Sequence, residues 1–213
     1  MNLRYERKYV APGLSHQQVL LLLRRHPALL RVAFPPRRVN SVYLDTPGLA
    51  DYFDHVNGSP SRSKTRIRWY GNAGIEAPVL EHKVKIGAVG HKVTWRLAPI
   101  EAGWLDRGAP LRGVAADDQQ RAAMARRAPV LVTRYERSYL ASAIGPLRIT
   151  VDHDLVFSRV GSAAPPVPAP AELAVVVELK YGQEASDFAA EVAAALPLRM
   201  VRCSKYVLGV ERV

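Results

Sequence analysis

The chain has 213 residues, of which 48% are hydrophobic and 23% charged, which is typical of a globular protein. Its formal net charge of +11 is unusual and predicts a polyanionic partner: nucleic acid, an anionic membrane or phosphate groups. A single cysteine, Cys203, excludes an intrachain disulfide framework. The charged start of the chain excludes a signal peptide, and no apolar run is long enough to cross a membrane. We therefore expect a cytoplasmic protein with no membrane span of its own.

The first quarter of the chain predicts two strands and two helices. Residues 3–10 alternate as a strand does, and Ser15 is a suitable N-cap for a helix that ends near residue 25. A second strand is expected over residues 39–44. Pro47 then opens another helix, because proline is favoured at the first helical position.

Residues 62–96 form the most basic stretch and read as three strands separated by two glycine-bounded turns. Eight Lys/Arg and two Glu give this stretch a net charge of +6 (8 − 2). Side chains alternate between the faces of a strand, so each strand has one ionic and one apolar face. A solvated sheet face would show the same alternation but would usually mix charges of both signs. The ionic faces of the first two strands carry Lys64, Arg66, Arg68, Glu81, Lys83 and Lys85.

The second half of the chain continues this organisation. Helices are expected over 115–127 and 186–196, strands over 130–141, 147–155 and 173–181, and an exposed Ala/Pro-rich loop at about 160–171. The roughly forty residues after the loop are few for an independent core. We therefore expect residues 1–213 to form a single domain.

Six expected strands carry a one-sided ionic face, namely 3–9, 63–70, 79–86, 91–97, 147–154 and 174–181. The opposite faces are apolar enough to be covered by helices, and if the sheet closes, the ionic faces turn inward and line a tunnel. Unpaired buried cations are costly, so such a tunnel needs anions such as phosphate chains. The inward carboxylates Glu6, Glu81, Asp152 and Glu178 are hard oxygen ligands suited to Mg²⁺ or Mn²⁺. Glu81 and Asp152 could equally pair with neighbouring cations.

Seven charged segments follow one another along the chain. They are Tyr5-Glu6-Arg7-Lys8-Tyr9, Ser63-Lys64-Thr65-Arg66-Ile67-Arg68, Glu81-His82-Lys83-Val84-Lys85, Tyr135-Glu136-Arg137, Arg148-Ile149-Thr150-Val151-Asp152, Val177-Glu178-Leu179-Lys180-Tyr181 and Cys203-Ser204-Lys205-Tyr206. In this order they resemble the VTC domain, the catalytic domain of the vacuolar transporter chaperone polyphosphate polymerase and a branch of the triphosphate tunnel metalloenzymes (CYTH-like superfamily). Each motif alone is common, but the ordered set covers almost the whole chain.

The resemblance implies an α+β fold, in which a closed antiparallel β-barrel forms a tunnel open at both ends and helices pack outside. It also implies a metal-dependent polymerase that transfers the terminal phosphate of a nucleoside triphosphate such as ATP to polyphosphate, with Mn²⁺ or Mg²⁺ as cofactor. The residues carried over as catalytic phosphate ligands are Arg66, Arg68, Lys83, Arg137 and Arg148. Further phosphate contacts would come from Lys8, Lys64, Lys85, Lys180, Ser204 and Lys205, with Lys85 assigned by strand parity. Glu178 would hold the metal, with Glu6 and Asp152 as further candidate ligands.

Arg4 stands where wider tunnel-family phosphohydrolases have the first of two alternating glutamates. This departure argues against a plain triphosphatase and agrees with the VTC branch. Two alternatives stay open: a hydrolase of triphosphate or polyphosphate on the same scaffold, and a non-catalytic polyphosphate-binding module. A membrane-protein partner also stays open.

Nucleic-acid binding is disfavoured, although the charge alone would suggest it. The chain has no helix-turn-helix, zinc-finger or RNP signature. Trp69 and Trp95 fall on the apolar faces of their strands, so they are expected in the core and not as base-stacking platforms. His82 is expected to serve packing, because no metal-ligand spacing surrounds it.

Overall fold

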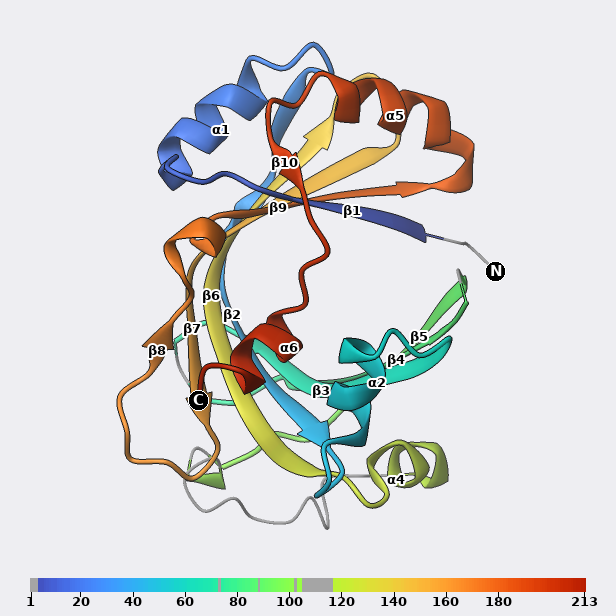
Figure 1. Ribbon diagram of the computed structural model, residues 1–213, viewed down its shortest axis with the longest axis vertical. Helices are drawn as coiled ribbons and strands as arrows, with labels where there is room; N and C mark the ends of the chain where they lie inside the picture. The colour runs from blue at the N-terminus through green and yellow to red at the C-terminus, as the bar shows by residue number, and fades with distance from the viewer. Residues whose placement is uncertain (1–3, 73, 88, 102, 105–116) are drawn as a thin grey trace. The chain divides into compact units, whose positions relative to one another are not determined.

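The computed structural model describes residues 4–213 except 73, 88, 102 and 105–116. Its strands form an antiparallel sheet in the order β10-β1-β9-β7-β6-β2-β3-β4-β5, with β8 paired to β7 (Figure 1). The strands are β1 (Arg4–Val10), β2 (Leu30–Asp45), β3 (Ser61–Tyr70), β4 (Val79–Ile86), β5 (Val89–Arg96), β6 (Ala128–Ser142), β7 (Leu147–Arg159), β8 (Val167–Pro168), β9 (Val176–Gly182) and β10 (Arg199–Met200). The helices are α1 (His16–Arg24), α2 (Ala50–Val56), α4 (Asp118–Met124), α5 (Ser186–Ala194) and α6 (Lys205–Val210), with 3₁₀ turns at Ala171–Leu173 and Gln183–Ala185.

The chain divides into two compact units. Unit 1 comprises Met1–Arg37, Tyr135–Leu155 and Ala169–Cys203, and unit 2 comprises Arg38–Arg134, Val156–Pro168 and Ser204–Val213. Strands β2, β6 and β7 each contribute residues to both units. For that reason the division does not test the prediction of a single domain.

In unit 1 the register of β1, β9 and β7 places the expected ionic side chains on one face. Glu6 lies opposite Lys180, which lies opposite Arg148, and in the next such row Lys8 lies opposite Glu178. Most of the alternate residues are apolar, with Arg7 as an exception on β1, and they form the core of this unit together with α1 and α5, which lie against the strands in Figure 1. Ser15 caps α1 as predicted, since its side chain accepts the Gln18 amide hydrogen.

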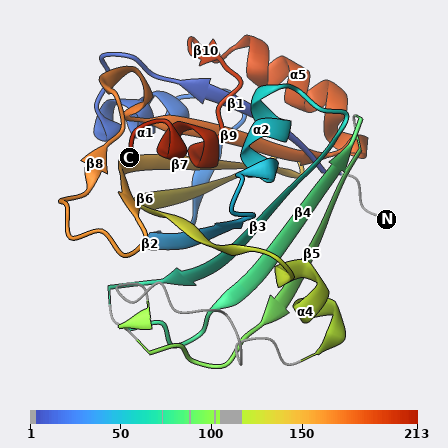
Figure 2. The same ribbon diagram turned by 60° about the horizontal axis from the view of Figure 1, so that its bottom comes forward.

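In unit 2, β3, β4 and β5 run side by side (Figure 2). Their apolar faces form a second core, in which Ile67, Trp69 and Leu80 are buried and α4 contributes Met124. Trp95 is partly buried against the same core, so the prediction that both tryptophans pack inside is confirmed. His82 also serves packing, with its Nδ1 2.8 Å from the Thr65 hydroxyl.

The prediction of a closed barrel is wrong. The strand order has two ends, β10 and β5, and no ladder joins them in the described residues. Period-two alternation shows which side chains share a face, but it does not show which strands pair. Closure needs a ladder between the first and last strands, and β10 is a two-residue strand.

The prediction that the helices pack outside, away from the ionic faces, is wrong for helix α6. Its Tyr206 stacks on Tyr43, which lies in register with Arg66 on the ionic face of unit 2. The helix therefore covers part of an ionic face. Among the described residues no helix is both long and apolar enough to span a bilayer.

Candidate functional site

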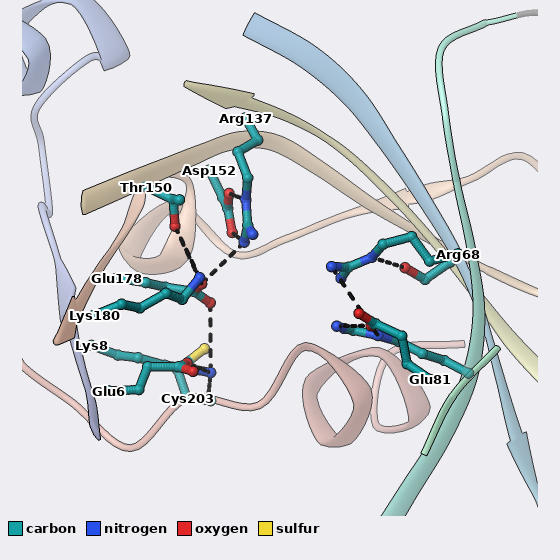
Figure 3. A network of polar contacts seen from close by, with 12 residues as sticks. Glu6, Lys8, Arg68, Glu81, Arg137, Thr150, Asp152, Glu178, Lys180 and Cys203 are labelled. Carbon is teal, nitrogen blue, oxygen red and sulfur yellow. Dashed lines mark hydrogen bonds and ion pairs between the residues drawn. The ribbon is translucent and has the colours of Figure 1, made fainter. Parts of the chain in front are cut away.

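The ionic face of unit 1 gathers two carboxylates around a buried arginine (Figure 3). Arg137 lies on β6 and is 7% exposed. Its Nε and one terminal nitrogen donate to the two oxygens of Asp152, at 2.5 and 2.6 Å. The same terminal nitrogen lies 3.1 Å from Oε2 of Glu178. Burial alone would lower the pKa of Arg137, but the neighbouring charges, above all that of Asp152, raise it well above its ordinary value, so the arginine stays charged.

Glu178 is the carboxylate with the largest number of donors around it in this cluster. Its Oε2 accepts from Lys180 at 2.7 Å, from Arg137 at 3.1 Å and from the Thr150 hydroxyl at 3.3 Å. Its Oε1 lies 3.7 Å from Lys8 Nζ, which lies 3.2 Å from Oε1 of Glu6. The Lys8 ammonium therefore contacts two carboxylates at once, and it also donates to the Cys203 carbonyl at 2.9 Å.

The contacts of the three carboxylates Glu6, Asp152 and Glu178 indicate how well each would suit a divalent cation. Glu6 and Glu178 already share one positive charge, that of Lys8, and carboxylate oxygens are the ligands that Mg²⁺ and Mn²⁺ prefer. Asp152 differs, because Arg137 engages both of its oxygens. In the part of the chain that the structure describes, no group of three or more His, Cys, Asp or Glu side chains is arranged as a metal site. Glu178 and Glu6, whose shared contact is a lysine ammonium, are better suited to accept a cation than Asp152, which is held by Arg137.

The ionic face of unit 2 is a grid of cations. The registers of β3, β4 and β5 place Lys64, Lys83 and Lys92 directly opposite one another in a single cross-strand row. The rows on either side place Arg62 opposite Lys85, and Arg66 opposite Glu81. Like charges directly opposite on neighbouring strands are destabilising, so the lysine row is a place where a bound polyanion would relieve repulsion. The complete face holds Arg62, Lys64, Arg66, Arg68, Lys83, Lys85, Lys92 and Arg96, against the single carboxylate Glu81.

Glu81 is an ion-pair partner in this structure. It is 7% exposed, and its carboxylate lies 2.5 Å from Arg66, 3.7 Å from Arg68 and 2.9 Å from Lys92. Burial raises the pKa of Glu81, but the three facing cations outweigh burial and hold it far below its usual range. Of the two readings left open by the sequence, the structure favours the salt-bridged one.

The third group of predicted residues meets at the start of α6. Ser204 is the N-cap of the helix, and its hydroxyl accepts hydrogen bonds from Lys64 at 2.8 Å and from the Val207 amide at 3.3 Å. Lys205, the first residue of α6, is 6% exposed. The predicted residues Lys64, Ser204 and Lys205 are therefore brought together within unit 2, whereas Lys8, Arg137, Arg148, Asp152, Glu178 and Lys180 belong to unit 1.

Four side chains of these faces have roles that the sequence did not predict. Alternation places Thr150 and Lys92 on ionic faces without indicating their partners. Tyr43 accepts a hydrogen bond from Arg66 at 3.2 Å, and Ser41 accepts one from Arg68 at 3.4 Å. The ion pair of Lys92 with Glu81 depends on the pairing of β4 with β5, and the contacts of Tyr43 and Ser41 depend on the pairing of β2 with β3.

Comparisons with known proteins agree with this geometry. The VTC domain family matches residues 3–213. A search of curated proteins gave no significant match. Among solved structures, a candidate adenylate cyclase from Vibrio parahaemolyticus is similar with a TM-score of 0.56 and 13% identity, covering 97% of this chain and 98% of the other. A protein from Pyrococcus horikoshii OT3 is similar with a TM-score of 0.54 and 12% identity, covering 98% of each chain. At such identities the two structures support the fold alone. The family match spans nearly the whole chain and includes every cationic strand described above, and the chain belongs to the VTC domain family.

Proposed function

We propose that the protein is a metal-dependent polyphosphate polymerase that transfers the terminal phosphate of a nucleoside triphosphate to a polyphosphate chain. The observation that carries the proposal is the cross-strand row Lys64–Lys83–Lys92 on a face with eight cations and one carboxylate. Such a surface is unfavourable by itself and is suited to a ligand with closely spaced negative charges. Membership of the VTC domain family supports polyphosphate as that ligand.

The cations suit phosphoryl transfer because this reaction depends on positioning and charge neutralisation more than on an elaborate nucleophile. Arg66 and Arg68 would present fork-shaped donors to phosphate oxygens, and Lys83 would add a point charge. In unit 1, Arg137 is held in one orientation by the two oxygens of Asp152, so it could contact phosphate without reorganising. Arg148, which is exposed on the same face as Lys180, would add a further cation.

Glu178 and Glu6 would hold the divalent metal, for which we propose Mn²⁺ or Mg²⁺. Bound there, the metal would neutralise phosphate charge and polarise the phosphoryl group. Lys8 would then release the two carboxylates and turn to phosphate. Its present contacts with both carboxylates, at 3.2 and 3.7 Å, support this exchange of one positive charge for another.

The test is incubation of the pure full-length chain with ATP and Mn²⁺, followed by separation of the products on a polyphosphate gel. We expect a ladder of long polyphosphate, which Glu178→Gln abolishes. The matched control is Glu172→Gln, which makes the same change at an exposed glutamate of a 3₁₀ turn and should leave the ladder unchanged.

The products also separate the other functions. Orthophosphate without a ladder would indicate a hydrolase. Cyclic AMP with pyrophosphate would indicate the activity named for the Vibrio parahaemolyticus structure. Binding of polyphosphate without turnover would indicate a binding module, and each of these results would overturn the polymerase.

A further inference from the structure

Tyr206 is the aromatic residue through which helix α6 packs against the rest of unit 2. Tyr206 is 1% exposed. Its ring stacks on Tyr43, with centroids 4.9 Å apart and planes 25° apart, and meets Tyr52 edge-on at 6.5 Å. Tyr43 is itself in contact with the ionic face, since its hydroxyl accepts a hydrogen bond from Arg66. The anchor of α6 and a predicted phosphate ligand therefore share one tyrosine.

The hydroxyl of Tyr206 donates a hydrogen bond to the buried carboxylate of Asp45. Asp45 is fully buried, with 0% exposure, and ends β2. It also accepts the backbone amide hydrogens of Thr46 at 2.7 Å and of Asp51 and Tyr52 at 3.0 Å each. Three amides and one phenol thus surround one carboxylate, which is the kind of satisfied buried network that holds its members in a single arrangement. Burial and then the hydrogen bond to Asp45 raise the pKa of Tyr206, so the phenol keeps its proton at neutral pH.

Helix α6 also packs closely at Gly209, which lies one turn after Tyr206 on the same buried face of the helix. A Cβ added at Gly209 would clash with the Leu131 side chain and would lie 2.6 Å from that of Phe157. The helix is therefore held on its buried face both by close packing at Gly209 and by the Asp45–Tyr206 hydrogen bond. Ser204 and Lys205 directly precede Tyr206 in the chain, so the position of Tyr206 determines where these two side chains lie.

We propose that Asp45 and Tyr206 are positioning residues of the phosphate-binding site: they hold α6 so that Ser204 and Lys205 complete the cationic face that includes Lys64. The inference rests on the proposed function, because it assumes that this face binds polyphosphate. Neither residue needs to touch the ligand. Tyr206 acts through Lys205 and through the Lys64–Ser204 hydrogen bond of 2.8 Å.

The test is a double-mutant cycle on the full chain, with binding of polyphosphate of defined length measured over a series of salt concentrations. Tyr206→Phe removes only the hydroxyl. We expect it to weaken binding roughly 5- to 10-fold and to reduce the slope of log K against log salt by about 0.7 for each phosphate group that the protein no longer neutralises. Combined with Lys205→Ala, it should add little beyond Lys205→Ala alone. Combined with Lys83→Ala, a change outside α6, its effect should be additive.

Two further variants separate positioning from general loss of stability. Tyr9→Phe removes a buried tyrosine hydroxyl in the core of unit 1 and should leave the salt slope unchanged. Gly209→Ala disturbs α6 at another position of the same buried face and should show the same coupling to Lys205→Ala, which keeps the test valid if Tyr206→Phe does not fold. Additivity of both α6 variants with Lys205→Ala, or a lower melting temperature with unchanged binding, would overturn the inference. Absence of polyphosphate binding by the unaltered chain would overturn the proposed function as well.

Discussion

Asp152 and Glu178 differ in how firmly the fold already binds their carboxylate oxygens. Asp152 is 1% exposed and receives two short hydrogen bonds from one guanidinium, so it is a structural partner of Arg137. Glu178 is contacted by two flexible ammonium groups as well as by that guanidinium. Ammonium groups on long stems can turn away at little cost, whereas a buried bidentate pair cannot. Substitutions at these two positions should therefore have different consequences.

Asp152→Asn should destabilise the fold. It removes one charge from a buried pair and leaves Arg137 without its main counter-ion, a change that typically costs about 3–5 kcal/mol. Urea denaturation would measure the loss of unfolding free energy. Asp118→Asn is the matched control, because its ion pair with Arg121 is solvent-exposed, with the two side chains 96% and 57% exposed, and should change stability by less than about 1 kcal/mol. Equal effects of the two substitutions would contradict this account of Arg137.

Stability should fall between pH 7 and pH 5. Burial lowers the pKa of His16, His55 and His82. Charge repulsion from His153, whose ring centroid lies 3.7 Å from that of His16, lowers the pKa of His16 further. The folded protein therefore binds protons at lower pH than the unfolded chain does. Stability is complete above the ordinary histidine pKa of 6.5 and declines as the pH falls below it. Urea denaturation at several pH values would measure the slope, which His16→Gln should reduce. Stability that is constant or rises over this range would contradict the prediction.

At the scale of the element, sequence alternation predicted which side chains share a strand face. It did not predict the full length of β2 or the position of α6. Lys8 and Glu178 were assigned to an ionic face by parity alone, and the register of β1 with β9 places them opposite each other. The first half of β2 was missed because Pro35 and Pro36 interrupt the strand pattern. The position of α6 was also not predicted, because it depends on a contact between Asp45 and Tyr206, which are 161 positions apart in the chain. Contacts of this kind leave no local periodicity.

Gly209→Ala should destabilise the protein by about 1–3 kcal/mol, because the added methyl group must displace Leu131 or Phe157 in close-packed surroundings. Alanine is the better helix former, so intrinsic propensity would favour the substitution and cannot explain a loss. Thermal unfolding would measure the effect. The matched control is Gly48→Ala, since a Cβ at Gly48 meets nothing within 4 Å. An unchanged melting temperature for Gly209→Ala would mean that α6 packs less closely than the structure indicates.

For the whole molecule, the net charge of +11 is unevenly distributed over the ionic faces. In unit 1 the predicted cations Lys8, Arg137, Arg148 and Lys180 are nearly balanced by Glu6, Asp152 and Glu178. In unit 2 eight cations face one carboxylate. A surface meant only for solubility would intersperse the two signs. The carboxylates suited to a metal and the largest surplus of positive charge thus lie in different units of the chain.

This distribution predicts how salt acts on polyphosphate binding. If the ligand displaces counter-ions from the cations of unit 2, affinity should fall steeply with salt, and each cation removed should reduce the slope by about 0.7. Lys64→Ala, Lys83→Ala and Lys92→Ala should each do so, since the three side chains form one cross-strand row. Arg121→Ala, which removes an exposed cation of α4, is the control and should leave the slope unchanged. Titrations at four or five salt concentrations would give the slopes. If the α4 control and the lysine row change the slope equally, binding would depend on net charge alone, and the grid of cations on β3, β4 and β5 would not be the binding surface.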